Sequence, residues 1–544
     1  MSTLASKIWR GGSIRTMDEA LSVAQAMAAD AAGKLLCVGS EEEVMALAGP
    51  DTQIIDLKGA WVVPGLIEGH GHLPVYGSSL LTLPIRDVSK EGILQLVAEA
   101  AAKAEPGTWI VGGMGWNNEV WADPTYPTLA ELDAVSPANP VMLPRMDGHL
   151  IWANTLAYRA AGVDDSTPNP VGGEFMRTAD GKLQGCASNK AAQMVRDMIP
   201  APTAEERKKA LLAAQERLLK FGVTTFTDMG TDLTLMEDVK ALYESGEYKI
   251  RFYGCIRDAL KDDALPEEKA FIEAGPRIGL YNDHFTVRAA KLLGDGAVGA
   301  QSAHLNQPFS DRPGHCGTGM FTDEELTKQV RRAADHGFQM TIHSIGDYTV
   351  EQVLRVYKKV LEERPAFDHR WRVEHFQTVT SDTPQQAAAI GAIPSMQPMH
   401  APNSAGMAIR RLGEERIHGA YAAGLVLRGT GIVAFGSDCP VATPSPLSGI
   451  HAAVTRTNDS LLPEGGFCME NAVTPLEALK GYTTWGAYTQ FAEKVRGSLE
   501  AGKCADFVVM DRDVLAVAET DPHAVLKIKV LQTVIDGEAV YTAE

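Results

Sequence analysis

The sequence has 544 residues, of which 45% are hydrophobic and 22% are charged, and its formal net charge is −19 at pH 7. A chain of this length is too long to fold around one hydrophobic core, so we expect a large domain and a smaller one. The chain is acidic and has no concentrated basic face, so we do not expect nucleic acid as a partner. No apolar run approaches membrane-spanning length and residues 1–18 lack the apolar core of a signal peptide, so we expect a cytoplasmic protein with no membrane partner.

The cysteines are odd in number, scattered, and never spaced as Cys-x-x-Cys. This pattern indicates reduced thiols rather than a disulfide framework. The residues are Cys37, Cys186, Cys255, Cys316, Cys439, Cys468 and Cys504. Nothing in the composition indicates the oligomeric state, and a homodimer is left open.

Short strand-like segments separated by turns occupy both ends of the chain. They lie at residues 13–17, 24–29, 35–39 and 53–57 near the N-terminus, and at 506–511 and 530–541 near the C-terminus. Neither end has enough strands to bury a core alone. We therefore expect residues 1–60 and 497–544 to pair into one discontinuous β domain.

An apolar run at residues 61–67 is followed by Glu68-Gly-His70-Gly-His72. The run suits a strand buried on both faces. Because residues i and i+2 of an extended chain point to the same side, His70 and His72 can reach a single metal ion. The alternative is a chance triplet in a loop, and the choice depends on residues further along the chain.

Between residues 200 and 497, apolar strand-like runs alternate with amphipathic helical segments, which is typical of parallel β/α architecture. The expected helices lie at 204–221, 323–336, 348–363 and 475–489. The expected strands lie at 222–227, 285–290, 338–342, 370–374, 391–397 and 431–437.

Polar side chains follow the ends of these strands. Asp228, Lys291, His343, His375 and Asp438 each come directly after an apolar run. In a (β/α)₈ barrel the carboxyl ends of all strands open on one face, where active sites are built. This placement favours one common site over a random scatter of the fourteen histidines.

Five ordered motifs carry a resemblance to a known family. They are Pro64-Gly-Leu-Ile-Glu-Gly-His-Gly-His, Lys291-Leu-Leu-Gly-Asp-Gly-Ala, His343-Ser-Ile-Gly-Asp, Arg372-Val-Glu-His and Phe435-Gly-Ser-Asp. In this order they resemble the motifs of the amidohydrolase superfamily, in particular the branch containing N-substituted formamide deformylase and the YtcJ-like proteins. The resemblance covers nearly the whole chain, including the return into the β domain at 497–506.

The resemblance implies an α/β fold with a distorted (β/α)₈ TIM barrel at 61–496, a β-sandwich built from both termini, and an inserted, lid-like subdomain within 74–200. It implies one or two divalent metal ions, most often zinc. The implied ligands are His70, His72, Lys291, His343, His375 and Asp438, with Lys291 carboxylated by CO₂. Asp438, Lys291 and His343 are the implied catalytic residues.

The chemistry of these side chains is consistent with that implication. Four imidazoles and one carboxylate suit zinc or a similar borderline ion. Such an ion lowers the pKa of a bound water from about 16 to about 7 and polarises a substrate carbonyl. Asp438 can take a proton from the attacking water and pass it to a leaving nitrogen. A lysine amine cannot ligate a cation while protonated, but a carbamate on Lys291 would be an anionic bridge between two metals.

Each assignment has a structural alternative. His343 and His375 taken singly would be core histidines, Lys291 a surface or ion-paired lysine, and Asp438 a cap for the following segment. A separate alternative is a site with one metal in which Lys291 stays an ordinary amine that hydrogen-bonds substrate. Their occurrence in matched motifs at strand ends favours the site. Whether there are one or two metals, and whether Lys291 is carboxylated, stays open.

Four further residues are expected to contact substrate. Trp116 and His149 lie in the inserted segment, in motifs rich in groups that pack against ligands. His304 and His400 follow predicted strands and would line the pocket without ligating metal. The alternative for the tryptophans is that they form the core of the insertion.

The sequence therefore predicts a metal-dependent hydrolase that cleaves a C–N bond of a small, fairly apolar amide, formamide or related compound, using hydroxide activated by the metal. A deaminase of the same superfamily is one alternative, because the same hydroxide could attack an amidine carbon. A non-catalytic ligand-binding or regulatory protein on this scaffold is another.

Overall fold

The computed structural model describes residues 4–86, 88–113, 115–118, 121–146 and 150–544. These form two compact units, one of Met1–Leu73 with Gln215–Glu544 and the other of Pro74–Ala214. Among the described residues, no helix is both long enough and apolar enough to cross a membrane.

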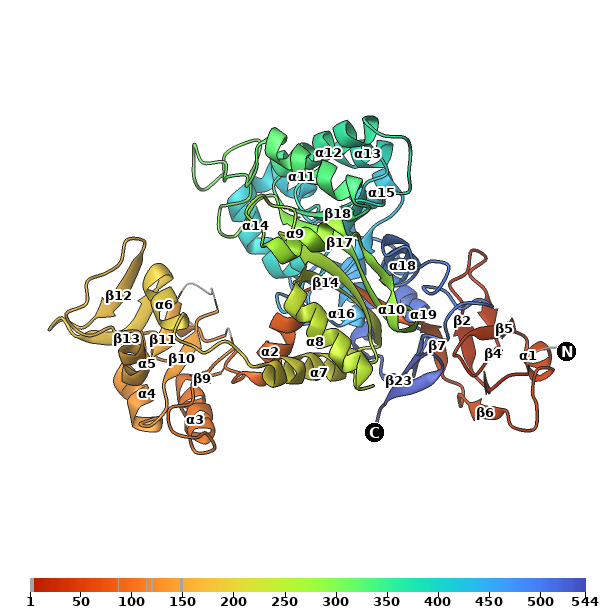
Figure 1. The fold of residues 1–544 in the computed structure, drawn as a ribbon, viewed down its shortest axis with the longest axis horizontal. Helices are drawn as coiled ribbons and strands as arrows, with labels where there is room; N and C mark the ends of the chain where they lie inside the picture. Colours follow the sequence, from red (N-terminus) through yellow and green to blue (C-terminus); the bar gives the residue numbers. More distant parts are fainter. Residues whose placement is uncertain (1–3, 87, 114, 119–120, 147–149) are drawn as a thin grey trace. The chain divides into compact units, whose positions relative to one another are not determined.

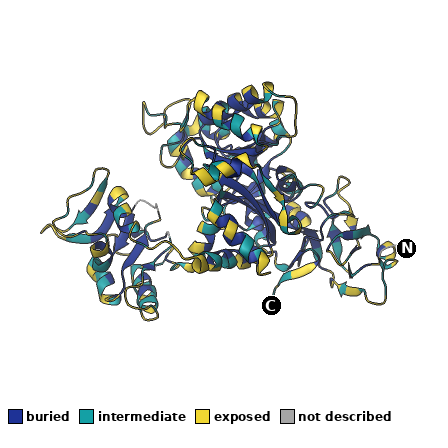
Figure 2. Ribbon diagram, in the orientation of Figure 1, coloured by how far each residue is buried: buried dark blue, intermediate teal, exposed yellow. Residues whose placement is uncertain are grey.

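Eight parallel strands of the first unit form a nearly closed barrel. In sheet order they are β8 (Leu66–Gly71), β14 (Val223–Thr231), β15 (Arg251–Arg257), β17 (Phe285–Leu293), β18 (Gln339–Ser344), β19 (Arg372–His375), β20 (Ile393–Met396) and β21 (Ala434–Phe435). A parallel bridge between Gly71 and Cys439 brings the chain after the last strand beside the first. The strands are buried on both faces (Figure 2), and the predicted barrel is confirmed.

The barrel closes through a close approach of two backbones. A Cβ atom at Gly69 would lie 2.4 Å from the carbonyl oxygen of Phe435. The amide of Asp438 donates to the carbonyl oxygen of His70 at 2.7 Å, and that of His72 donates to Cys439 at 2.9 Å. These bonds hold the turn after β21 against the end of β8, where the His-Gly-His triplet lies.

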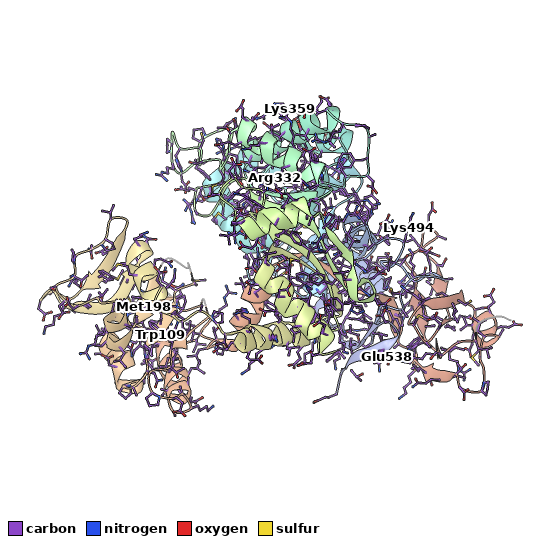
Figure 3. All side chains as sticks on the ribbon, in the orientation of Figure 1. Trp109, Met198, Arg332, Lys359, Lys494 and Glu538 are labelled. Carbon is purple, nitrogen blue, oxygen red and sulfur yellow. The ribbon has the colours of Figure 1, made fainter. Side chains whose placement is uncertain are left out.

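Amphipathic helices cover the outside of the barrel (Figure 1). In α11 (Asp323–Asp335), Leu326, Val330 and Ala333 are buried at helical spacing, and a capping box of Thr322 and Glu325 fixes its start. The next helix, α12 (Asp347–Glu362), presents Lys359 to solvent (Figure 3). Both helices lie where the apolar periodicity predicts them.

Three sequence predictions differ from the structure. Strand β15 was not expected, because it begins and ends with arginine and carries no metal-binding group at its end. The helix expected at 475–489 is two helices, α17 (Pro475–Gly481) and α18 (Thr484–Thr489). The helical course is interrupted at Thr483, whose φ of −131° and ψ of −97° are not helical.

The third difference concerns the apolar run at 61–67, which forms two strands rather than one. Strand β7 (Trp61–Pro64) pairs with β2 (Ser13–Arg15) and β22 (Phe507–Met510) of the β domain, and β8 starts the barrel. Gly65 separates them; a Cβ there would lie 2.2 Å from Thr224 Oγ1, and its amide donates to Asp506 at 2.9 Å. The barrel therefore begins after Gly65 rather than at Trp61.

The β domain combines both ends of the chain. One sheet has the order β24–β23–β22–β7–β2–β3, with β3 at Val23–Ala24, β23 at Val530–Ile535 and β24 at Glu538–Thr542. The second has the order β5–β4–β1–β6, with β1 at Lys7–Arg10, β4 at Ala26–Ala29, β5 at Leu35–Gly39 and β6 at Gln53–Asp56. Trp9 packs edge-on against Phe507 at 5.1 Å in their shared core, so the expected joining of the termini is confirmed.

The second unit has its own sheet and core. The strand order is β12 (Gly173–Arg177), β13 (Leu183–Ser188), β11 (Leu150–Ala153), β10 (Val141–Pro144) and β9 (Ile110–Val111). Helices α3 (Lys90–Ala101), α4 (Leu129–Val135), α5 (Thr155–Ala160) and α6 (Asn189–Arg196) accompany it. Two buried hydrophobic clusters, one around Trp116 and Trp152 and one around Tyr158 and Phe175, form its interior.

Candidate metal centre

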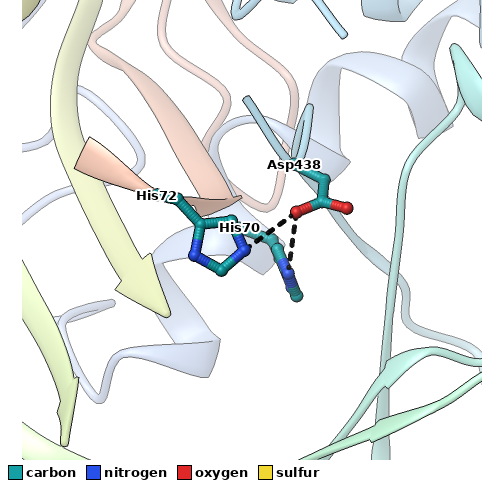
Figure 4. A group of neighbouring side chains, drawn as sticks. All are labelled: His70, His72 and Asp438. Carbon is teal, nitrogen blue, oxygen red and sulfur yellow. Dashed lines mark ion pairs between the residues drawn. The ribbon is translucent and has the colours of Figure 1, made fainter. Parts of the chain in front are cut away.

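The end of β8 and the turn after β21 place two imidazoles against one carboxylate. Asp438 Oδ1 lies 3.1 Å from His72 Nε2 and 3.5 Å from His70 Nε2. Figure 4 shows both rings directed at that oxygen. His70 and His72 therefore reach one point, as the alternation of side chains along a strand predicts.

Two of the predicted site residues have unusual backbone conformations. His375 has a φ of +68° and Asp438 a φ of +58°, a left-handed region that residues other than glycine seldom adopt. In strand register His343 is opposite Glu374, so an undistorted strand would direct the side chain of His375 to the other face of the sheet. The turn at His375 instead leaves its ring 4.8 Å from that of His70, measured between ring centroids. Such local strain is typical of functional sites.

A buried network orients His70. Its Nδ1 atom lies 2.6 Å from Glu374 Oε2, and Arg372 holds Glu374 through a contact of 2.7 Å to Oε1. All three side chains are fully buried. Burial and the charge of Lys291 each lower the pKa of His70, but its contacts with the carboxylates of Asp438 and Glu374 outweigh them and raise it.

With Nδ1 engaged by Glu374, the other ring nitrogen of His70 is free to ligate. Nε2 is buried, makes no hydrogen bond of normal geometry within the described structure, and lies 3.5 Å from Asp438 Oδ1. A histidine held at one nitrogen by a carboxylate and open at the other is the usual arrangement at metal sites. The residues present therefore fit the divalent metal ion that the fold and donor set imply.

His375 is oriented in a similar way and joins a second set of donors. Its Nδ1 atom lies 2.7 Å from Gln397 Oε1. Donor atoms of His375, His400 and Asp438 lie within 4.8 Å of one another, as do those of His70, His72 and Asp438. Burial and the neighbouring imidazoles lower the pKa of His375 well below its usual value, so the ring is neutral at physiological pH and able to ligate.

The structure places His343 beside this group. Its ring centroid lies 4.4 Å from that of His375, while its Nε2 atom lies 3.1 Å from the carbonyl oxygen of Gly296. Burial, followed by the charge of Lys291, lowers the pKa of His343 to about 4, so this ring is also neutral at pH 7. Its assignment as a ligand remains a prediction.

Lys291 is almost completely buried at 2% exposure. Burial lowers the pKa of its amine, and the carboxylates of Glu374 and Asp438 only partly oppose this shift. The shift makes the neutral amine, the form that reacts with CO₂, easier to reach than it is for an exposed lysine. This environment is compatible with carboxylation of Lys291, which remains a prediction.

Asp438 is ionised at neutral pH. Burial alone would raise the pKa of its carboxyl group, but hydrogen bonds with His70 and His72 lower it well below the usual value. The carboxylate can therefore accept a proton at the point where the imidazoles meet.

The expected substrate-binding residues lie in different environments. His400, at the start of α14 (His400–Arg416), has Nε2 4.0 Å from Asp438 Oδ2 and lies next to the donors. The contacts of His304 are with other residues. Its backbone amide donates to Asp295, and its ring packs on Tyr348 with the ring centroids 4.0 Å apart. Their roles towards substrate remain predictions.

Trp116 lies in the core of the second unit. It is 0% exposed, its indole nitrogen donates to the carbonyl oxygen of Leu143 at 2.7 Å, and its ring stacks on Trp121 at 5.7 Å. This environment favours the alternative that the tryptophans form the core of the insertion. His149 lies outside the described residues.

Residue-by-residue reasoning missed the groups that orient the ligands. Glu374 and Arg372 lie within a family motif and Gln397 at the end of an expected strand, but none of them is predicted to have a role from the sequence. The available signal was a charged pair in Arg372-Val-Glu374, inside a strand whose four residues are all buried. Two charges in such a strand require partners, because burying an unpaired charge is costly.

Imidazole and carboxylate donors gathered at the carboxyl ends of barrel strands are an arrangement found in metal-dependent barrel enzymes. The chain matches the amidohydrolase family over residues 53–541, and it belongs to that family. This membership makes it a hydrolase and implies the use of a divalent metal ion.

Three relatives match this chain over nearly its whole length. The protein LONG AFTER FAR-RED 3 of Arabidopsis thaliana is 31% identical over 99% of this chain and 92% of its own length, and YtcJ of Bacillus subtilis is 30% identical over 98% and 99%. The N-substituted formamide deformylase of Arthrobacter pascens is 26% identical over 96% of each chain. Among solved structures, an uncharacterized metal-dependent hydrolase from Pyrococcus horikoshii OT3 is 25% identical, with a TM-score of 0.79, over 95% of this chain and 99% of that one.

Proposed function

We propose that this protein is a metal-dependent hydrolase that cleaves a C–N bond of a small amide, formamide or related compound. The observation that carries the proposal is the meeting of His70 and His72 on Asp438, where the buried Nε2 atom of His70 makes no hydrogen bond of normal geometry within the described structure. The similarity to an N-substituted formamide deformylase along nearly the full length supports the bond type.

The residues have separate duties in this proposal. His70, His72 and His375 would hold the metal together with Asp438, and Glu374 and Gln397 keep two of those rings in position. A bound divalent ion supplies a nucleophilic oxygen at neutral pH and polarises the substrate carbonyl. Asp438 receives the proton released by the attacking water and returns it to the leaving nitrogen, which would otherwise depart as an unstable amide anion.

Zinc is the metal we propose, because a donor set dominated by neutral imidazoles suits a borderline ion better than magnesium or calcium. A second ion would require another anionic ligand. Carboxylated Lys291 is the group we propose for it, since its amine is buried and burial lowers its pKa.

The test combines metal analysis with a substrate screen. Protein purified without chelator should contain a transition metal and should hydrolyse N-formyl, N-acyl, carbamate or cyclic amide compounds. The products would be an amine and a carboxylate from the N-formyl and N-acyl compounds, an amine, CO₂ and an alcohol from carbamates, and a single ring-opened amino acid from cyclic amides. Release of ammonia from amidines instead would identify a deaminase. Metal-loaded protein that turns over none of these compounds would contradict the proposed function and favour a regulatory role.

A further inference from the structure

A small cavity lies beside the metal centre and is lined by His375, Gln397, His400, Tyr421 and Arg456. Its walls come from the end of β19, the turn after β20, the start of α14 and the end of α16 (Pro446–Thr455). Because His375 and His400 also belong to the donor group around Asp438, the cavity adjoins the position where a scissile bond would lie.

Three polar nitrogens on the walls have no hydrogen-bond partner within the described structure. They are the amide nitrogen of Gln397, the Nε2 atom of His400 and one terminal nitrogen of Arg456. Gln397 is 6% exposed and Arg456 is 1% exposed. Buried polar groups in folded proteins are nearly always paired, so three unpaired groups around one cavity indicate a polar ligand.

Arg456 is the most informative of the three. Its Nε atom donates to the carbonyl oxygen of Phe467 at 2.8 Å, which fixes the guanidinium, but no carboxylate of the described residues forms an ion pair with it. Burial lowers the pKa of Arg456 to about 10, so the group still carries its charge at neutral pH. An isolated buried charge is costly, and an anionic ligand would compensate it.

We propose that this cavity binds a carboxylate of the substrate, so that the natural substrates are amides bearing an acidic group near the scissile bond. The guanidinium of Arg456 would pair with the carboxylate, and the Gln397 amide would donate to it. The cavity has room for about one water-sized group, so a carboxylate would place one oxygen in it and leave the body of the substrate outside. This inference rests on the proposed hydrolase function and narrows its substrate class.

The experiment compares pairs of compounds that differ only in charge: N-formyl and N-acetyl amino acids and their C-terminal carboxamides. Wild-type holoenzyme should have the higher kcat/KM for the acids. Arg456→Gln should lower kcat/KM for the acids by about 10- to 100-fold while changing that for the carboxamides less than about threefold. Arg456→Lys should keep part of the preference because it keeps the charge.

The matched control is Arg428→Gln, at an exposed arginine that binds the backbone carbonyl of Glu470. It should leave the preference for acids unchanged. Equal losses of Arg456→Gln on acids and carboxamides, together with a lower Tm, would show that Arg456 only supports the fold. A wild-type enzyme that prefers the carboxamides would also overturn the inference.

A binding measurement separates this inference from the proposed function. Calorimetric titration of N-acetylglycine into metal-loaded wild type and Arg456→Gln requires no turnover. Binding that depends on Arg456 without hydrolysis of any compound would support the cavity and contradict the hydrolase proposal. Hydrolysis without binding that depends on Arg456 would support the hydrolase proposal and contradict the carboxylate-binding role of the cavity.

Discussion

At the scale of single residues, a substitution at Asp438 can distinguish loss of proton transfer from loss of metal binding. Its carboxylate is ionised and lies 3.1 Å from His72 Nε2. Asp438→Asn keeps the size and one oxygen donor but removes the proton acceptor, so we expect metal content to persist while kcat falls by about 100-fold or more. Metal analysis and steady-state kinetics on the same preparation test this.

The control is Asp459→Asn, which removes a carboxylate that binds Ser448 outside the site, at 3.0 Å. It should leave kcat unchanged. Near-normal turnover of Asp438→Asn would remove this residue from the mechanism.

Glu374 is expected to act through His70. Glu374→Gln weakens the hold on His70 Nδ1 and leaves Arg372 without its buried counter-charge, so metal affinity should fall by about 10- to 100-fold. The measurement is competition with a chelator of known affinity. Glu493→Gln breaks the partly exposed pair with Arg370 near the other end of β19 and serves as the control. Equal metal affinity in both variants would contradict the orienting role.

At the scale of elements, Gly65 separates a strand of the β domain from the first strand of the barrel. A methyl group there would lie 2.2 Å from Thr224 Oγ1, so Gly65→Ala should destabilise the protein by about 1–3 kcal/mol through overpacking. Displacement of β8 would also move His70 and His72. Thermal denaturation and metal content test both effects.

Gly406→Ala is the matched control, because its added methyl group meets no atom within 4 Å in the helix α14. It should leave Tm unchanged or raise it slightly, since alanine favours helix. Thr224→Ala combined with Gly65→Ala should recover part of the lost stability. No recovery would indicate that the strain at Gly65 comes from the backbone instead.

At the scale of the whole molecule, a buried ion-pair network joins the β domain to the barrel. Arg251, the first residue of β15, binds Asp506 at 2.6 Å and also pairs with Asp536 in the turn between β23 and β24. Burial alone would raise the pKa of Asp536, but the hydrogen bond from His284 and the charge of Arg251 lower it to about 2.

The sign of this shift sets the pH dependence. A carboxyl group with a lowered pKa in the folded state stabilises the protein above its unfolded value of about 3.9, and that contribution is lost as the pH falls towards 2. Asp536→Asn should therefore lower the free energy of unfolding by about 1–2 kcal/mol at pH 6, and the difference from wild type should shrink below about pH 4. Denaturant titrations from pH 6 to pH 3 check this. If the difference in free energy of unfolding between wild type and Asp536→Asn does not change over that range, the pH-dependent stability does not come from Asp536.

Local pattern was sufficient for several features of this protein. The spacing of His70 and His72 determines that both rings leave the same side of a strand, because alternation is a property of the extended backbone itself. Helices α11 and α12 followed from apolar periodicity, and the pairing of the two ends followed from strands too few to bury a core separately.

Tertiary structure decided the features that depend on contacts between distant segments. Glu374 is 304 positions from the ring that it orients, and Arg456 shares a cavity with His375 from a different element. The division at Gly65 depends on Thr224, which approaches from another strand. Burial and charge pairing are properties of the assembled barrel, so the sequence determined which groups could meet at the site, and only the fold decided which of them are left without a partner.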